Sequence, residues 1–389
     1  MGNISVIKKN KLCMSCGACS SVCPVGAIKM DYMEQEGVYR PSIDENKCVD
    51  CGKCISVCPA ERQDKISLMG DFRALYLAHA TDDNVRHWAT SGGVINALVR
   101  YLLDTGIVEA VLMTGYCKDS PIEAKPYWLT RDNVSMLTKY PRDFSSRYTI
   151  VPVLEKMKEV SKNASIAVVG TSCHMTALKC MVGTNNQNIF KIGITCSGGM
   201  SYLATTEFKR LKNAQSAKMF YRGDGWPGKN SLLTDQDCLS ENHNGSLFER
   251  MFSSQIFKNS GCRYCKDHFA EDAEISFCDF WNKDEMTNEH EGNSCVIVRS
   301  DRAYRIIKAM EADNYIQIVR ELTETEIESG QLQVLKVKKG DPEKLHSYRL
   351  FMKTKEFIFT HRLYRLFGYK VYKLLCRVYN KIIQQIRIQ

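Results

Sequence analysis

Short apolar runs alternate between residues 75 and 340 with segments whose apolar residues recur every three or four positions. A short apolar run is typical of a buried strand, and a spacing of three or four is typical of an amphipathic helix. Strands separated by helices predict a mainly parallel sheet. The predicted strands are 74–80, 109–117, 165–170 and 188–196, and the predicted helices are 92–106, 174–182 and 201–212.

These patterns divide the chain into three parts. Residues 1–70 contain two short repeats rich in cysteine. Residues 71–344 contain the alternating pattern, which is interrupted at 221–231 and 237–246 by segments rich in Gly, Asn and Asp that predict loops. Residues 345–389 are basic and aromatic. We therefore expect two folded domains, the second of them an α/β domain, followed by a helical C-terminal tail.

The length and composition suit this organisation. The chain has 389 residues, of which 44% are hydrophobic, as in ordinary globular proteins. No apolar stretch reaches the ~18 residues that a membrane span requires, and residues 1–10 contain no apolar core of a signal peptide. We therefore expect a cytoplasmic protein. In that reducing compartment, eighteen cysteines favour metal ligation or redox chemistry over a disulfide framework.

The net charge of +9 resides in the tail. Residues 345–389 hold ten Lys and Arg and one acidic residue, Glu356, so the rest of the chain is neutral and no nucleic-acid partner is expected. Apolar residues recur there every three or four positions, which predicts a basic amphipathic helix. Such a helix lies on the inner face of a membrane or docks on a partner; the alternative is a terminal helix packed on its own domain. The apolar positions are Tyr364, Phe367, Val371, Leu374, Leu375, Val378, Ile382 and Ile386.

Two copies of the pattern C-x2-C-x2-C-x3-C-P occur at residues 13–24 and 48–59. This is the pattern of bacterial dicluster ferredoxins, in which three cysteines bind one 4Fe-4S cluster and the fourth crosses to the other cluster. With residues 26–44 between them, predicted as short strands around an acidic turn, the repeats predict an α+β dicluster ferredoxin-like domain. Two zinc sites are the alternative. The predicted ligands are Cys13, Cys16, Cys19 and Cys58 for one cluster and Cys48, Cys51, Cys54 and Cys23 for the other.

Four further cysteines stand where the second domain would bring them together. Cys173 begins a predicted helix after a strand, Cys196 ends a strand, and Cys262 and Cys265 form another C-x2-C. Open parallel sheets bind ligands at the carboxyl ends of their strands. We therefore predict a third 4Fe-4S cluster on these four residues, with zinc or unligated buried cysteines as the alternatives. The remaining cysteines, which are expected to be structural, are Cys117, Cys180, Cys238, Cys278, Cys295 and Cys376.

A helix start with little side-chain obstruction occurs at Ser91, Gly92 and Gly93. Free backbone amides and the positive end of the helix dipole suit a phosphate group there. The alternative is a simple helix cap by Thr90 or Ser91. The three residues are predicted to bind a cofactor.

Five segments, in their order along the chain, resemble the family of coenzyme F420 hydrogenase/dehydrogenase beta subunits. Where the family reads G-T-P-C-Q, this chain has Ser172 and His174 on either side of Cys173, and where the family has a glycine before an aspartate it has Cys278 before Asp279. The five segments are SGGV at 91–94, VGTSC at 169–173, GITC at 193–196, RGDGWPG at 222–228 and CRYCKD at 262–267.

The resemblance implies an iron-sulfur flavoprotein oxidoreductase. Members bind FAD beside a 4Fe-4S cluster, several exchange a hydride with the deazaflavin F420, and bacterial members occur among genes of cell-surface polysaccharide synthesis. We expect electrons to pass between a redox partner protein or reduced cofactor, the ferredoxin clusters, the third cluster and a flavin near residues 91–94, and on to a small-molecule substrate. The alternatives are a non-catalytic electron-transfer subunit of a larger complex and a regulatory scaffold that holds zinc and iron-sulfur clusters.

Two polar side chains complete the predicted site. His174 is a candidate proton donor because its ordinary pKa lies near neutrality; the alternative is a residue that caps its own helix start. Arg222, with Asp224 and Trp226, is predicted to close over a bound cofactor; a solvated loop is the alternative.

Overall fold

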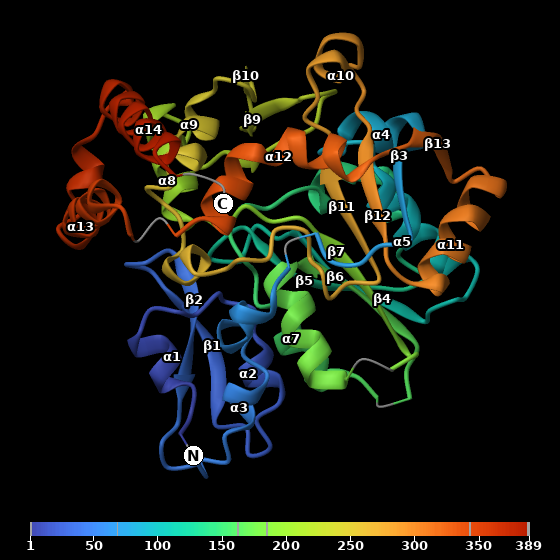
Figure 1. Ribbon diagram of the computed structural model, residues 1–389, viewed down its shortest axis with the longest axis horizontal. Coiled ribbons are helices and arrows are strands. Elements are labelled where there is room, and N and C mark those ends of the chain that lie inside the picture. The colour runs from blue at the N-terminus through green and yellow to red at the C-terminus, as the bar shows by residue number, and fades with distance from the viewer. Residues whose placement is uncertain (1, 68, 162, 184–185, 342–343, 387–389) are drawn as a thin grey trace.

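The computed structural model describes residues 2–67, 69–161, 163–183, 186–341 and 344–386. Its centre is an eight-stranded sheet with the strand order β13-β3-β12-β11-β7-β6-β4-β5 (Figure 1). The strands are β3 (Ala74–Ala80), β4 (Ala110–Tyr116), β5 (Ala124–Leu129), β6 (Ile166–Thr171), β7 (Ile189–Ile194), β11 (Ile275–Asp279), β12 (Ser294–Val298) and β13 (Ile316–Glu321).

The sheet is mixed, which corrects the prediction of a mainly parallel sheet. The four predicted strands are present, and β4, β6, β7 and β11 run parallel to one another. The flanking pairs β4–β5, β11–β12, β12–β3 and β3–β13 are antiparallel. Antiparallel neighbours need no helical crossover between them, so the alternation of strands and helices identified only the central strands.

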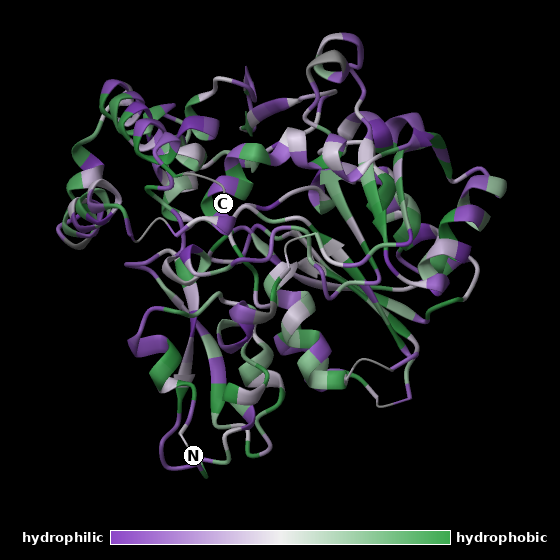
Figure 2. Cartoon of the chain, in the orientation of Figure 1, coloured by the Kyte–Doolittle hydropathy of each residue, from purple (hydrophilic) through white to green (hydrophobic). Residues whose placement is uncertain are grey.

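Helices cover both faces of the sheet. Helices α5 (Val94–Asp104) and α11 (Asp301–Ala312) pack on one face, where β6 contributes Ala167 and Val169. Helix α7 (Ser172–Val182) packs on the other face against Ile166 and Val168, and α12 (Glu324–Lys339) covers the same side further along (Figures 1 and 2). Successive strand residues point to opposite faces, so two cores meet at one sheet. The remaining helices of this part are α4 (Asp83–Trp88), α6 (Met136–Lys139), α8 (Leu203–Leu211), α9 (Leu247–Ser253) and α10 (Lys283–Asn288).

The segments predicted as loops at 221–231 and 237–246 are partly strands. β9 (Lys229–Leu233) pairs antiparallel with both β8 (Lys218–Phe220) and β10 (Cys238–Asn242). These strands are rich in polar residues, so they lack the apolar pattern that identifies a strand. Side-chain hydrogen bonds support them instead, such as the one from Asn230 Nδ2 to the Tyr221 carbonyl at 2.6 Å.

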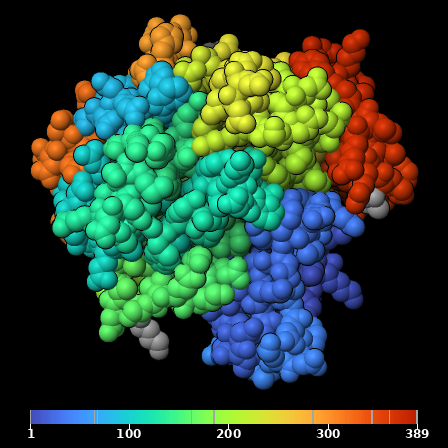
Figure 3. Space-filling model, turned by 180° about the vertical axis from the view of Figure 1, so that it is seen from behind, coloured from blue at the N-terminus to red at the C-terminus, as the bar shows by residue number. Residues whose placement is uncertain are grey.

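The N-terminal unit has its own small core, built around Ile4, Ile7 and the cysteines of the repeats. The short strands predicted between the repeats are present, and they pair antiparallel. Figures 1 and 3 show the unit as a lobe beneath the sheet domain. Two backbone bonds tie the lobe to that domain, from the Leu154 amide to the Cys16 carbonyl at 3.1 Å and from the Tyr202 amide to the Gly37 carbonyl at 2.7 Å. Its elements are α1 (Ser5–Lys9), α2 (Ala18–Ser21), β1 (Ile28–Met33), β2 (Val38–Ile43), α3 (Lys53–Ser56) and the 3-10 segment η1 (Pro59–Lys65).

The tail forms two helices, α13 (His346–Thr360) and α14 (Tyr369–Gln384), joined by a 3-10 turn at Leu363–Leu366. Of the predicted apolar positions, Tyr364, Ile382 and Ile386 are buried. The other buried residues of α14 were not among the predicted positions: Tyr372, Cys376, Tyr379 and Ile383. Val371, Leu374 and Val378 from the predicted face are exposed. The helix therefore packs on its own domain, against α9 among others.

Helices long and apolar enough for a membrane span are absent from the described residues. Residues 387–389 of the predicted tail lie outside them, as do 342 and 343 beside the predicted boundary at 344.

Candidate functional site

The first predicted ligand group, Cys13, Cys16, Cys19 and Cys58, lies inside the N-terminal lobe. All four side chains are buried, and the thiol of Cys19 lies near the other three. Burial raises the pKa of Cys16 to about 12, and it also raises the pKa values of Cys19 and Cys58. Such thiols become thiolates only beside a positive charge, which iron supplies. The donor set therefore fits an iron-sulfur cluster.

The second group, Cys23, Cys48, Cys51 and Cys54, is more open. Cys54 is buried, whereas Cys51 is exposed and the other two are half-buried. The Ala27 amide donates to Cys23 Sγ at 3.2 Å. The lobe thus has one buried cysteine group and one that reaches its surface. All eighteen cysteines lie in the described part of the chain, and every one is free.

Cys173, Cys196, Cys262 and Cys265 come together at the carboxyl edge of the sheet. Cys173 is in the first turn of α7, directly after β6, and Cys196 follows the neighbouring parallel strand β7. The thiol of Cys262 lies near those of Cys196 and Cys265, and the thiol of Cys173 lies near those of Cys262 and Cys196. Burial raises the pKa of Cys262 to about 12.

Glycines make this third group possible. The Gly199 amide donates to Cys262 Sγ at 3.3 Å, and a Cβ on Gly199 would lie 2.3 Å from Ile150.

Within the described residues, no three His, Cys, Asp or Glu side chains are placed to hold a single metal ion; this result covers the N-terminal cysteine groups as well.

The first and third cysteine groups adjoin each other across the boundary of the lobe. Cys16 lies near Cys173, and a Cβ on Gly261 would lie 2.3 Å from the Cys13 carbonyl. The buried Arg40 joins the two loops, because its guanidinium donates to the Cys13 carbonyl at 3.0 Å and to Asn259 Oδ1 at 3.0 Å. The backbones that carry the two groups are therefore in direct contact.

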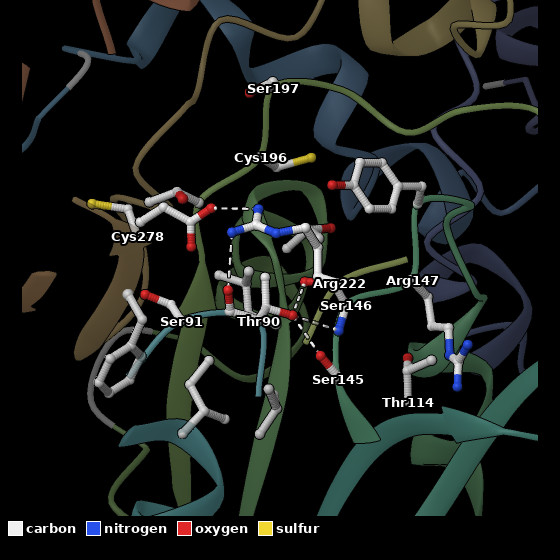
Figure 4. Close-up of a pocket in the computed structure, with 18 of the residues that line it drawn as sticks. Thr90, Ser91, Thr114, Ser145, Ser146, Arg147, Cys196, Ser197, Arg222 and Cys278 are labelled. Atoms are coloured by element: carbon white, nitrogen blue, oxygen red, sulfur yellow. Dashed lines mark hydrogen bonds and ion pairs between the residues drawn. The ribbon is translucent and has the colours of Figure 1, made fainter. Parts of the chain in front are cut away.

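A cavity of about 320 Å³ lies beside the third group, and its lining includes Cys196. Three of the four residues predicted to bind a cofactor line it: Ser91, Gly93 and Arg222. Figure 4 shows Ser91 and Arg222 at this cavity. Gly92 does not line it, because it packs so closely that a Cβ would lie 2.7 Å from the Ala78 carbonyl. The volume is within the roughly 300–1,000 Å³ range of ligand pockets.

The α5 helix start faces this cavity without a side-chain cap. Its first residue is preceded by Gly93 at φ +74°, and the simple cap by Thr90 or Ser91 does not occur. Thr90 instead bonds to Ser145 and Ser146 (Figure 4). Ser91 Oγ donates to the Asn293 carbonyl at 2.7 Å. The first amides of α5 have no partner within the helix. Together with these hydroxyls they form a polar wall.

Arg222 supports the cavity wall. Its guanidinium pairs with Asp279 at 3.0 Å, donates to the Thr90 and Pro227 carbonyls, and lies over the rings of Trp226 and Trp281. Burial lowers its pKa, but Asp279 and Tyr148 together more than offset this, so the pKa lies above its ordinary value and the group stays charged. The guanidinium N–H groups of Arg222, which were predicted to bind a cofactor, thus donate to protein acceptors instead.

His174 lines the cavity but both of its ring nitrogens are engaged. Nδ1 accepts from the Thr171 amide at 3.1 Å, and Nε2 donates to the Val151 carbonyl at 2.9 Å. Burial lowers its pKa to about 4. The contacts favour the second of the two interpretations made from sequence, a residue that caps the start of α7.

Four residues that support the site were not predicted from the sequence to do so. Asp279 and Trp281 hold Arg222, and Lys258 and Lys338 are buried beside the third cysteine group. Lys338 is 73 residues from Cys265 in the chain, yet its ammonium lies 3.6 Å from Cys265 Sγ. Only the fold brings these residues to the site. Asp279 alone had a sequence cue, because it follows Cys278 at the place where the family has a glycine before an aspartate.

The chain matches known families over most of its length. Residues 75–158 match the N-terminal part, and residues 163–324 the C-terminal part, of the beta subunit of coenzyme F420 hydrogenase/dehydrogenase. Residues 12–61 match the 4Fe-4S dicluster domain. This match favours 4Fe-4S clusters over zinc for the eight cysteines of the lobe.

The related proteins are named as coenzyme F420 enzymes or their subunits. The beta subunit of coenzyme F420 hydrogenase from Methanothermobacter thermautotrophicus is 24% identical over 265 residues, which are 63% of this chain and 84% of that protein. Coenzyme F420-dependent sulfite reductase from Methanocaldococcus jannaschii is 26% identical over 333 residues, which are 79% of this chain and 47% of that protein.

A chain of the F420-reducing NiFe hydrogenase complex from Methanosarcina barkeri has the same fold, with a TM-score of 0.52 at 21% identity over 70% of this chain and 90% of that chain. The fold, the matched segments and the cysteine groups therefore agree, and the protein belongs to the coenzyme F420 hydrogenase/dehydrogenase beta subunit family, with a 4Fe-4S dicluster domain in front.

Proposed function

We propose that the protein is an iron-sulfur flavoprotein oxidoreductase that carries electrons between a redox partner and a hydride carrier. One observation carries the proposal: the second, first and third cysteine groups and the cavity follow one another from the surface of the lobe to the sheet edge. The series runs from exposed Cys51 through buried Cys16 and Cys173 to Cys196 at the cavity.

Three 4Fe-4S clusters suit these twelve cysteines. The dicluster match supports the first two, with the ligand sets predicted from the repeats. The third set is supported by its four neighbouring thiols and by the Gly199 amide, which donates to Cys262 Sγ as amides do to cluster ligands. Such clusters accept and release one electron at a time.

The cavity is the proposed site of FAD. The polar wall of Thr90, Ser145 and Ser146 with the free amides of α5 suits the phosphates, because helix N-termini attract anions. The apolar side, with Val94 and Val169, suits a flat ring system. A flavin takes two electrons as hydride and releases them singly, so it connects hydride chemistry to clusters.

The proposed hydride carrier is a deazaflavin such as coenzyme F420, because the relatives above are named as F420 enzymes. A second function, an electron-transfer subunit without a substrate of its own, is favoured by the description of the F420 hydrogenase relative as one subunit of an enzyme. The exposed Cys51 gives a redox partner access to the chain in either case. None of the reported relatives concerns polysaccharide synthesis, and we propose no role there.

We also propose that the tail contacts an anionic membrane surface at its periphery. Leu366 is 81% exposed and Leu374 is 59% exposed, and Lys370, Arg377 and Lys381 are exposed beside them. Apolar side chains flanked by bases bind the interface of anionic bilayers. Co-sedimentation with vesicles of phosphatidylcholine and phosphatidylglycerol tests this, and binding that persists after Leu374→Ser with Leu366→Ser contradicts it.

Anaerobic mixing of the purified chain with reduced F420 tests the main proposal. We expect a bound flavin, reduction of that flavin, and then bleaching of the cluster absorption. NADPH and reduced ferredoxin serve as alternative donors. If a flavin is bound and responds only to reduced ferredoxin, the subunit function replaces the enzyme function. A preparation that binds no flavin contradicts the flavoprotein proposal.

A further inference from the structure

Two buried lysines lie beside the third cysteine group. Lys258 is 9% exposed and follows α9, and Lys338 is 5% exposed in the last turn of α12. The ammonium of Lys338 donates to the Asp267 carbonyl at 2.7 Å and lies 3.6 Å from Cys265 Sγ. Lysines are seldom buried to this extent, because removing an ammonium from water costs free energy unless a negative charge or several acceptors lie near it.

Lys258 lacks such compensation from the protein. Its ammonium makes no hydrogen bond or ion pair with any described residue, and its chain packs against Gly198, where a Cβ would lie 2.3 Å from Lys258 Cε. Burial lowers its pKa to about 8, and the charge of Lys338 acts in the same direction. The groups near it that favour its charge are the thiols of Cys196, Cys262 and Cys265.

Acidic side chains near the two lysines do not supply a negative charge to Lys258. Glu249 lines a cavity of about 160 Å³ together with both lysines, but it makes no ion pair with either within the described residues. The carboxylate of Asp267 lies near Lys338 and favours the charge of that ammonium, whereas Lys258 makes no ion pair within the described residues. At least one buried positive charge therefore faces the cysteine group without a carboxylate partner.

We propose that Lys258 and Lys338 are the charge partners of an anionic 4Fe-4S cluster on this cysteine group and raise its reduction potential. The inference rests on the third cluster of the proposed function. Four thiolates give such a cluster a net negative charge, and reduction adds one more. A nearby cation stabilises the reduced state more than the oxidised state.

The electron balance is simple. The oxidised cluster gains one electron, and a reduced ferredoxin cluster of the same chain loses it, with no bond made or broken. The higher potential makes the third cluster an acceptor for electrons that arrive through the lobe. Lys258 and Lys338 thus favour electron flow toward the cavity, and they act through the cluster without contact with a substrate.

An anaerobic redox titration followed by electron paramagnetic resonance tests this. The signal of the third cluster is identified by its loss in Cys262→Ser. Lys258→Met removes the charge and nearly keeps the length, and we expect at least a tenfold loss in the equilibrium constant for reduction, about 59 mV for one electron. Lys258→Arg should stay near the wild-type potential. Lys179→Met is the matched control, because that lysine lies on α7 with Cys173 but is half-exposed and paired with Asp272.

Iron analysis distinguishes a failure of the lysine hypothesis from the absence of the third cluster. Full iron content with an unchanged potential in both Lys258→Met and Lys338→Met overturns the inference and leaves the third cluster standing. An iron content of about eight per wild-type chain would show that the third cluster is absent and would contradict the proposed function. If Lys258→Met does not fold, Lys258→Gln and Lys338→Met provide the same comparison; a potential equal to that of Lys179→Met in these variants overturns the inference.

Discussion

Arg40 offers a sharp test of the contact between the lobe and the sheet domain. Its side chain is buried and donates to the Cys13 carbonyl and Ser15 Oγ in the lobe, and to Asn259 Oδ1 and Ser260 Oγ in the loop before Cys262. Arg40→Met keeps much of the volume but removes every donor. We expect the variant to fold and to open more readily at this contact.

The magnitude follows from the acceptors that lose their partner. The Cys13 carbonyl and Asn259 Oδ1 are buried, and each unsatisfied buried acceptor costs roughly 1–3 kcal/mol. The local opening free energy should therefore fall by about 2–6 kcal/mol. Since 1.36 kcal/mol is a factor of ten, amides protected by this contact should exchange at least about 30-fold faster.

Hydrogen–deuterium exchange under anaerobic conditions measures this opening. The Leu154 and Tyr202 amides are the reporters, because both donate across the boundary to lobe carbonyls. Arg62→Met is the control, since Arg62 lies in the lobe but donates one bond at its surface. Unchanged protection at both reporters in Arg40→Met, in a folded protein with a full iron content, would refute the reasoning.

Three further substitutions test the packing and charges. Leu98→Ala should lower the free energy of unfolding by about 2–5 kcal/mol in chemical denaturation, because Leu98 is fully buried, while the exposed Leu350→Ala should change it by less than about 0.5 kcal/mol. Burial lowers the pKa of His243 to about 3, so this side chain stays neutral in the folded state, whereas in the unfolded state it takes up a proton below about pH 6.5. The free energy of unfolding therefore decreases as the pH falls below that value. Between pH 7 and 5.5 this decrease should be about 1 kcal/mol smaller in His243→Phe than in the wild type. Gly198→Ala should lower the melting temperature more than Gly183→Ala, since both glycines have positive φ but only Gly198 packs against the buried lysine behind it; equal shifts would contradict the close packing.

The local patterns of the sequence predicted the centre of the fold. The central strands and α5, α7 and α8 follow from apolar spacing, because each is long and half or fully buried. The edge strands, and the polar strands β9 and β10, are stabilised by neighbours that are distant in the chain. The tail shows the same limit: Leu374 fits the apolar spacing, yet the domain packs against Tyr372 and Cys376.

The site divides in the same way. The cysteines were predicted because metal ligands have a characteristic spacing that can be recognised in the sequence. Ser91 and Gly93 were predicted because they stand at the start of a helix. Arg222 was identified without its partner Asp279, which lies 57 residues away. Lys258 and Lys338 were missed because a buried lysine has no local pattern; its environment exists only after folding.

Iron content of the anaerobically reconstituted protein tests the central claim most directly. Twelve cysteines in three groups predict about twelve irons in the wild type and about eight in Cys262→Ser, with Cys180→Ser unchanged because Cys180 lies on α7 outside every group. An equal iron content in Cys262→Ser and the wild type would contradict the account.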